Sequence, residues 1–483
     1  MMFIARVVIF IACIEMLFAS QSIGRADETI AGPGYSKFSL TLSSGHREEI
    51  TGPLFYSQQA EGQHQWAFPP FVCYTRNFDV DWVELDILYP VLTYRRFGSE
   101  YRGQFFQCFS YSGGQTQEEY GQKKTTIFPF YFQQRSTNTA DNYTALMPFY
   151  GHVVNRMMRD DIRVVLFPIF SETRKKDIVT DNYLYPFFHL RHGDGLNGWQ
   201  FWPVIGMEHK TPTSRTNTLD EVEIIGGHEH FFAVWPFFLK GREGIGTTNE
   251  EHRLTFFPFY NRLRSPLRDE TSWGCPFRCG RIDDRENKYV ENDYIWPLFV
   301  RARGSKTVTR IFPFYSRADN GTLESDFYLW PVYKFNRLQA PLLDRQRMRI
   351  FMFLYSDTVQ KSIETGKSTR RADFWPFYTF RHEMDGNEQL QALSLLQPFF
   401  PNNRTISREY DQVYSLWRWE KNAKTGAASE SFLWNLYRRE TAPKLKKISL
   451  LFGLIQYEST AGVKNWRVCY VHLNKARPVA TPF

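Results

Sequence analysis

The stretch Phe374-Trp375-Pro376-Phe377-Tyr378 shows the pattern on which the fold depends: apolar, aromatic, proline, apolar, aromatic. Nine copies of this core are centred on Pro129, Pro168, Pro186, Pro236, Pro258, Pro297, Pro313, Pro331 and Pro376. Looser copies surround Pro90, Pro148, Pro203 and Pro398, and degenerate copies lie around Pro69, Phe106, Phe353, Trp417, Trp434 and Phe452. With about 19 units in total, one repeat organises most of the chain.

The spacing of these cores favours one strand and one turn per unit. Between Pro129 and Pro376 a core recurs about every 22 residues. Aromatic and β-branched residues favour extended backbone, and a proline inside a helix would cost about 3 kcal/mol. Asp194-Gly195 and Asn320-Gly321 are typical hairpin dipeptides. The sequence therefore predicts an all-β fold, an antiparallel meander of about 19 repeated strands, with a proline near the middle of each strand.

Two forms of sheet fit this pattern. Residues 327–335 alternate over nine positions, as expected for a tilted strand of a large membrane barrel. The intervening residues, such as Trp330, are also apolar, which indicates that both faces of the strand contact protein. A large barrel and a curled sheet therefore both remain possible.

The composition agrees with a folded β protein. The 483 residues include 44 Phe, 26 Tyr, 13 Trp and 25 Pro, while the mean hydropathy is only −0.44. So many large rings exclude a disordered chain. No apolar run after residue 26 approaches the roughly 20 residues of a spanning helix, which excludes a helical membrane protein. We expect residues 27–483 to form a single β-repeat domain.

The first residues resemble an export signal. Arg6 precedes an apolar stretch, and Gly24-Arg25-Ala26 supplies the small residues that a signal peptidase requires, so residues 1–26 are predicted to be a signal peptide. In one alternative, Cys13 is lipidated and becomes the first residue of the mature protein. In another, the segment is a buried element of the fold. Export would allow Cys275 and Cys279 to form a local disulfide, although two free thiols fit as well.

Few residues suggest chemistry. His228 and His230 lie on one face of an expected strand and His252 follows on the next segment, but a metal needs three or four converging ligands. His189 and His192 do not share a face. The chain contains no phosphate-binding Gly-rich loop and no G-x-S-x-G motif.

Paired carboxylates do not change this reading. Asp160-Asp161 and Asp283-Asp284 are expected in connecting segments, where such pairs usually keep loops solvated. The sequence therefore predicts a protein that is not an enzyme and has no catalytic residue, no cofactor and no metal site.

Charge and rings together suggest what the protein contacts. The net charge of +8 attracts lipid head groups or acidic polysaccharide, although it also serves solubility. A basic residue often follows the aromatic core, as Arg135, Arg262 and Arg317 do. Such rings and cations can bind sugars or anions, or the rings can form the core while the arginines end the strands.

The repeated core followed by arginine resembles uncharacterised exported proteins of Gram-negative bacteria that have aromatic-Pro-aromatic strands. The resemblance covers nearly the whole mature chain, including residues 451–457 and 466–472, and the chain ends in an aromatic residue, Phe483, as many outer-membrane barrels do. It implies an envelope location and a sheet-rich fold, and it provides no catalytic residues.

These observations predict a non-enzymatic protein of the outer membrane, or associated with it, that serves as a channel, transport or surface component. Its expected partners are membrane lipids, with polysaccharide or envelope proteins also possible, and no nucleic acid. The alternative is a periplasmic or cell-surface scaffold that binds polysaccharide or protein. An exported hydrolase is a third, weaker possibility.

Overall fold

The computed structural model describes residues 30–31, 34–114, 121–216, 222–274, 278–401 and 403–473. The expected signal peptide, residues 1–26, and Cys13 lie outside these ranges, as does Cys275.

Nearly all of the described chain belongs to one antiparallel sheet of 44 strands. Each strand pairs with the strand before it and the strand after it in the chain, as β11, β12 and β13 do. One hairpin, β21–β22, is inserted between β20 and β23 and forms a sheet of its own. The predicted all-β antiparallel meander is therefore confirmed.

The first half of the sheet consists of β1 (Ile30–Ala31), β2 (Tyr35–Ser39), β3 (Gly45–Ile50), β4 (Phe55–Ala60), β5 (Gln63–Phe68), β6 (Val72–Asn77), β7 (Trp82–Ile87), β8 (Leu92–Phe97), β9 (Glu100–Phe105), β10 (Phe109–Gly113), β11 (Lys123–Ile127), β12 (Tyr131–Arg135), β13 (Tyr143–Leu146), β14 (Tyr150–Arg156), β15 (Arg159–Val165), β16 (Phe170–Lys175), β17 (Ile178–Tyr183), β18 (Phe188–Gly193), β19 (Leu196–Phe201) and β20 (Ile205–Lys210). The inserted hairpin is β21 (Thr213–Thr216) and β22 (Val222–Ile225).

The second half consists of β23 (Gly227–Ala233), β24 (Phe238–Ile245), β25 (Glu251–Phe256), β26 (Tyr260–Arg264), β27 (Arg268–Trp273), β28 (Arg278–Asp284), β29 (Tyr289–Trp296), β30 (Phe299–Gly304), β31 (Thr307–Ile311), β32 (Tyr315–Asp319), β33 (Leu323–Tyr328), β34 (Tyr333–Ala340), β35 (Leu343–Ile350), β36 (Tyr355–Ser362), β37 (Ser368–Phe374), β38 (Tyr378–His382), β39 (Glu388–Ala392), β40 (Trp417–Lys421), β41 (Ala428–Phe432), β42 (Tyr437–Ala442), β43 (Leu445–Leu450), β44 (Ile455–Thr460), β45 (Val463–Val468) and β46 (Val471–His472). The described helices are α2 (Arg404–Glu409) and α3 (Asp411–Tyr414), with short 3-10 turns η2 (Gly52–Leu54) and η3 (Thr139–Asp141).

The repeated prolines lie in turns, and this corrects the expected number of strands. In the hairpin β11–β12, Ile127 pairs with Tyr131, and the Phe130 N–H donates to the Ile127 carbonyl at 2.7 Å. Pro129, between them, follows a cis peptide bond, which is the arrangement of a type VI turn. Each unit of about 22 residues therefore holds two strands and two turns, and the prediction of about 19 strands, one per unit, is wrong by roughly a factor of two.

The physical reason is the missing N–H of proline. A proline inside a strand would remove a ladder hydrogen bond, whereas a turn requires no donor at that position. Thirteen X-Pro bonds are cis, including those that precede Pro70, Pro90, Pro148 and Pro203. Pro398 is not among them. In the degenerate copies around Phe106 and Phe452, consecutive left-handed residues make the turn instead, whereas Trp417 begins β40.

Neighbouring proline turns are hydrogen-bonded to one another. The Leu166 N–H donates to the Phe149 carbonyl at 2.7 Å, and the Phe167 N–H donates to the Pro148 carbonyl at 2.7 Å. The Tyr185 N–H and the Pro168 carbonyl repeat this contact at 2.8 Å. The turns therefore form a continuous edge of the sheet.

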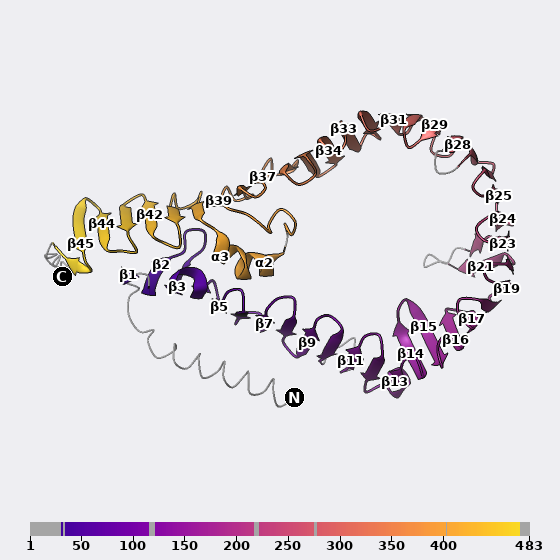
Figure 1. Cartoon of the computed structure of the whole chain (residues 1–483), viewed down its shortest axis with the longest axis horizontal. Helices are drawn as coiled ribbons and strands as arrows, with labels where there is room; N and C mark the ends of the chain where they lie inside the picture. Colours follow the sequence, from indigo (N-terminus) through magenta and orange to yellow (C-terminus); the bar gives the residue numbers. More distant parts are fainter. Residues whose placement is uncertain are drawn as a thin grey trace.

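The sheet curls into a ring that closes where its first strands, β2 and β3, lie alongside β39–β42 near α2 and α3, and the last strands extend past this junction (Figure 1). Side chains join the two parts at this junction: Thr41 Oγ1 donates to Ser429 Oγ at 2.6 Å, and Asn435 Nδ2 donates to Glu49 Oε2 at 2.6 Å. Ladder hydrogen bonds do not connect β1 to β46. Of the two expected forms, the curled sheet is therefore the one observed.

Candidate functional site

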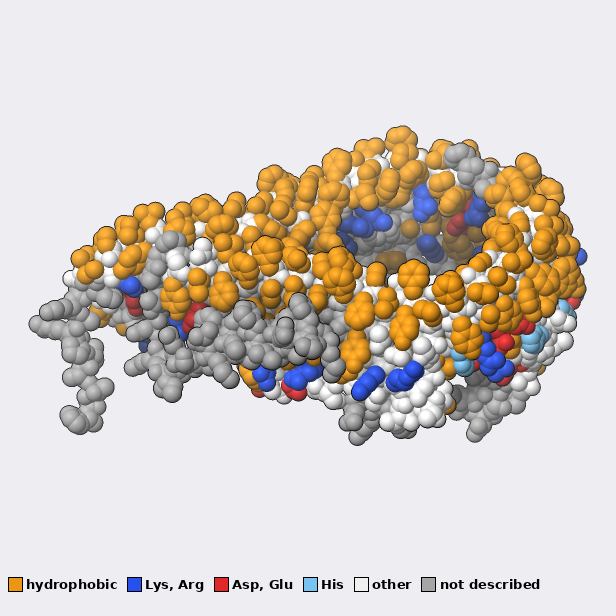
Figure 2. Space-filling model, turned by 60° about the horizontal axis from the view of Figure 1, so that its bottom comes forward, with side chains coloured by type: hydrophobic (Ala, Val, Ile, Leu, Met, Phe, Trp, Pro, Cys, Tyr) orange, Lys and Arg blue, Asp and Glu red, His pale blue; other side chains and the backbone are white. Residues whose placement is uncertain are grey.

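One edge of the sheet exposes a row of large apolar side chains, which we call the aromatic edge. It is defined by the proline turns and their degenerate copies, which all join an odd-numbered strand to the following even-numbered one. Its most exposed rings include Phe130 (58%), Phe149 (60%), Phe259 (64%) and Phe314 (61%). Figure 2 shows hydrophobic side chains along the rim of the ring. The expectation that these rings form the core of the sheet is therefore wrong.

The opposite edge, the polar edge, is built differently. Its turns include Asp194-Gly195, Ser305-Lys306 and Asn320-Gly321. Its exposed apolar residues are fewer and scattered, and they include two rings, Phe78 and Phe97, besides Met158, Leu342 and Ile363. The molecule is therefore amphipathic along the direction of its strands, because successive turns alternate between the two edges.

The face of the sheet that lines the hollow of the ring, the inner wall, is rich in polar residues. Residues paired directly across strands share a face, and one such row joins Arg310, Ser316, Phe327, Lys334 and Arg349. The row continues to Thr379, which lies on the face where Arg381 contacts Gln397, in the segment leading to α2. Figure 2 shows Lys and Arg side chains inside the hollow.

On the opposite face of these strands, the outer wall, arginines of β32–β37 form ion pairs with carboxylates. Arg317 contacts Glu324 at 3.5 Å, and Arg337 contacts Asp344 at 2.9 Å. Arg370 contacts Asp357 at 2.8 Å. Each arginine of this set therefore has a carboxylate on a neighbouring strand.

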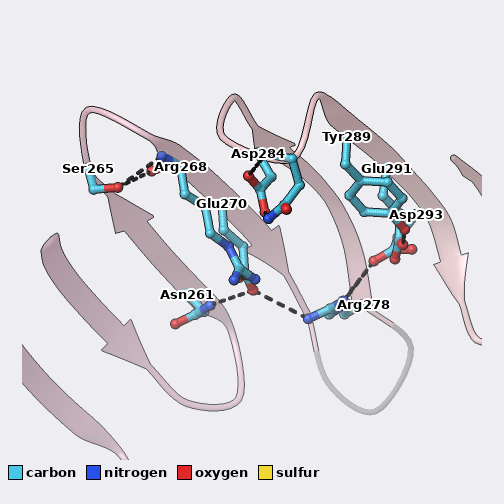
Figure 3. Close-up of polar contacts among 10 residues, drawn as sticks. Asn261, Ser265, Arg268, Glu270, Arg278, Asp284, Tyr289, Glu291 and Asp293 are labelled. Carbon is cyan, nitrogen blue, oxygen red and sulfur yellow. Dashed lines mark hydrogen bonds and ion pairs between the residues drawn. The ribbon is translucent and has the colours of Figure 1, made fainter. Parts of the chain in front are cut away.

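An acidic part of the inner wall lies between β27 and β29. Arg278 points toward Glu270 on one side and Asp293 on the other (Figure 3), with nitrogen–oxygen distances of 3.5 Å and 2.9 Å. Burial raises the pKa of Asp293 to about 6, and the neighbouring Glu291 adds to this effect. In the turn that follows β28, hydrogen bonds from Asn287 lower the pKa of Asp284.

The predicted histidine pair has a third neighbour that sequence reasoning missed. Glu208, on β20, lies directly opposite His230, and its Oε1 is 2.7 Å from His228 Nε2. The ligand atoms of Glu208, His228 and His230 lie within 4.8 Å of one another, close enough to be considered as a metal cluster. However, Arg191 Nη1 contacts the second oxygen of Glu208 at 2.5 Å, so this group already has a cation. Glu208 lies beside the two histidines only because β20 pairs with β23 in this register, and the sequence does not reveal that register.

The other expected residues do not converge. His252 lies two strands from His228, on the opposite face, and contacts Glu250 at 3.3 Å. His189 and His192 lie on opposite faces of β18, as predicted.

The expectation that the paired carboxylates lie in connecting segments is wrong. Asp160-Asp161 lie in β15 and Asp283-Asp284 lie in β28, rather than in connecting segments, because β14 pairs with β15 along almost its whole length and β28 is extended to its last residue. Asp161 contacts His152 at 2.8 Å. Among the described cysteines, Cys279 is a free, exposed thiol.

Comparison with models of known families, with curated proteins and with solved structures finds no match to this chain. Neither of the two helices that the structure describes is long and apolar enough to cross a membrane.

Proposed function

We propose that the chain is a non-enzymatic, membrane-associated β protein that lies on a lipid surface through its aromatic edge. The observation that carries this proposal is the concentration of exposed rings on one edge, along a row of turns that are hydrogen-bonded to one another. Export by the N-terminal segment would bring the protein to the outer membrane or periplasm.

Physical chemistry supports lipid as the partner of this edge. Trp and Tyr are favoured where an apolar phase meets water, and Phe is typical of surfaces that insert among lipid chains. Each ring that inserts contributes about 1.5–3 kcal/mol, so a row of turns binds strongly even if every contact is shallow. The net charge of +8 adds attraction to anionic head groups.

Vesicle sedimentation tests the proposal. The purified chain is mixed with vesicles of phosphatidylethanolamine and phosphatidylglycerol, and the bound fraction is measured. Replacing Phe130, Phe149, Phe259 and Phe314 together by Ser is expected to weaken binding at least tenfold, because four exposed rings would no longer insert.

The polar edge supplies a matched control. Met158, Leu342 and Ile363 are also exposed, at 90%, 67% and 54%. Their replacement by Gln should leave vesicle binding unchanged. Equal losses in the two variants, or no binding by the unaltered chain, would contradict lipid docking through the aromatic edge.

A periplasmic scaffold that binds polysaccharide or protein is the second candidate. The charged inner wall favours it, because such a surface suits a polar ligand better than a membrane interior does. Fractionation separates the two. Retention with membranes after washing with carbonate supports the lipid-bound form, whereas release without detergent supports the scaffold.

A further inference from the structure

Five cations lie together on the inner wall of β31–β35. Arg310, Lys334 and Arg349 occupy one row across the strands. Arg347 and Arg345 follow on the same face of β35, since every second residue of a strand faces the same way. Lys334 and Arg349 are directly opposite one another, where two like charges destabilise a sheet.

These five cations are not neutralised by carboxylates of the described chain. None of them forms an ion pair with a described residue, whereas Arg317, Arg337 and Arg370, on the outer wall of the same strands, all do. The nearest carboxylates on the inner row lie two strands beyond either end of the cluster, and both are already held. Asp373 contacts Arg371 at 2.9 Å and accepts from Thr379 Oγ1 at 2.8 Å, and Asp293 contacts Arg278 at 2.9 Å.

Two of the guanidinium groups retain unused donors. The Nε atoms of Arg347 and Arg349 are buried, and no described residue accepts a hydrogen bond from them. Arg349 donates from Nη2 to Asn336 Oδ1 at 3.1 Å, which orients its side chain. Burial, and then the neighbouring cations, lower the pKa of both Lys334 and Arg347. The folded chain therefore holds converging positive charge that an anion would stabilise.

We propose that Arg310, Lys334, Arg345, Arg347 and Arg349 form a binding site for the phosphate groups of an anionic ligand. Phosphate suits this site because its oxygens accept from the planar fork of arginine in pairs. Several cations in a row fit a ligand with several phosphates better than a single small anion. This site lies on the inner wall and does not depend on docking of the aromatic edge.

Calorimetric titration with sodium tripolyphosphate at low ionic strength tests the site. Binding to the unaltered chain is expected, together with a rise in melting temperature, because the ligand relieves repulsion between Lys334 and Arg349. The variant Arg347→Gln/Arg349→Gln should bind at least tenfold more weakly. Without ligand it should melt no lower than the unaltered chain, so loss of binding would not reflect loss of folding.

The outer wall supplies the control, Arg337→Gln/Arg370→Gln, which removes the same charge from paired positions. This control should bind tripolyphosphate within twofold of the unaltered chain. The proposal is overturned if the unaltered chain does not bind, or if the two double variants lose affinity equally. The exposed Arg345→Gln, a milder change, should lose affinity without altering the melting temperature.

A second titration distinguishes the source of the phosphate. Dihexanoyl phosphatidic acid, used below its micellar concentration, presents a phosphate attached to a lipid. Tighter binding of this lipid than of tripolyphosphate, lost in Arg347→Gln/Arg349→Gln, supports a lipid head group as the ligand. Tighter binding of tripolyphosphate, lost in the same variant, supports a soluble polyphosphorylated ligand.

Discussion

At the scale of single residues, the contact between α2 and β7 concentrates buried charge. Glu409 and Asp86 are fully buried beside Arg408, which contacts Glu84 at 2.6 Å and Asp86 at 3.8 Å. Arg95 also contacts Glu84, at 3.1 Å, so two guanidinium groups face three carboxylates. Burial raises the pKa of Glu409 to about 8 and that of Asp86 to about 6, and the other carboxylates add to both shifts.

Stability should therefore fall as the pH rises through this range. An unfolded Glu titrates near pH 4.3, so the folded state binds the Glu409 proton more tightly, and raising the pH from about 5 to 8 costs on the order of 3 kcal/mol. At pH 8 Glu409 is half ionised, and the loss is complete above about pH 9. Glu409→Gln should flatten the pH dependence of the melting temperature and stabilise the protein at pH 8.

The exposed Glu383→Gln is the matched control for that measurement and should keep the slope of the unaltered chain. An unaltered chain that melts at the same temperature from pH 5 to pH 8 would contradict the assignment. So would a Glu409→Gln variant with an unchanged slope.

At the scale of strands and turns, the sequence predicted the elements but not their boundaries. The aromatic core and the Asn-Gly and Asp-Gly dipeptides correctly indicated short antiparallel strands. Periodicity alone could not show that Pro331 and its equivalents end a strand, because aromatic residues suit both strands and exposed turns. The missing N–H of proline was the available signal, and it favours a turn over the middle of a ladder.

Gly304 shows how tightly a hairpin constrains the backbone. It ends β30 with φ +118°, and an added Cβ would lie 1.7 Å from the Lys288 carbonyl oxygen. Gly304→Ala is therefore expected to lower the free energy of unfolding in urea by about 2–4 kcal/mol.

Gly321 separates backbone strain from the clash. Its φ is also positive, at +81°, but an added Cβ would meet nothing within 4 Å. Gly321→Ala should therefore cost only about 1 kcal/mol. Equal costs for the two substitutions would mean that the close approach of Gly304 to Lys288 does not persist in solution.

At the scale of the whole molecule, neither the aromatic edge nor the inner wall could be predicted from the sequence. Both depend on parity and register: which turns share an edge, and which side chains lie opposite one another. Glu208 next to His230 and Lys334 opposite Arg349 are examples, because each contact joins residues that no local pattern relates.

The closure of the ring can be tested by cross-linking. Thr41 Oγ1 and Ser429 Oγ are 2.6 Å apart although the residues lie near opposite ends of the chain. With the exposed native cysteines replaced by Ser, Thr41→Cys/Ser429→Cys should form a disulfide under mild oxidation, detected by mass spectrometry of the linked peptides. The control pair Thr41→Cys/Ser305→Cys, across the ring, should not. A failure of the first pair to cross-link would indicate an open ring.

The alternation of turns also constrains how such a chain can change in length. Every strand contacts its neighbours in sequence, so whole hairpins can be duplicated or lost without breaking distant pairings. A change of two strands keeps every later proline turn on the aromatic edge, whereas a change of one strand moves all later turns to the polar edge. Strands are therefore expected to be gained or lost in pairs during evolution. The circumference of the ring can then vary, while the aromatic and polar residues stay on their own edges.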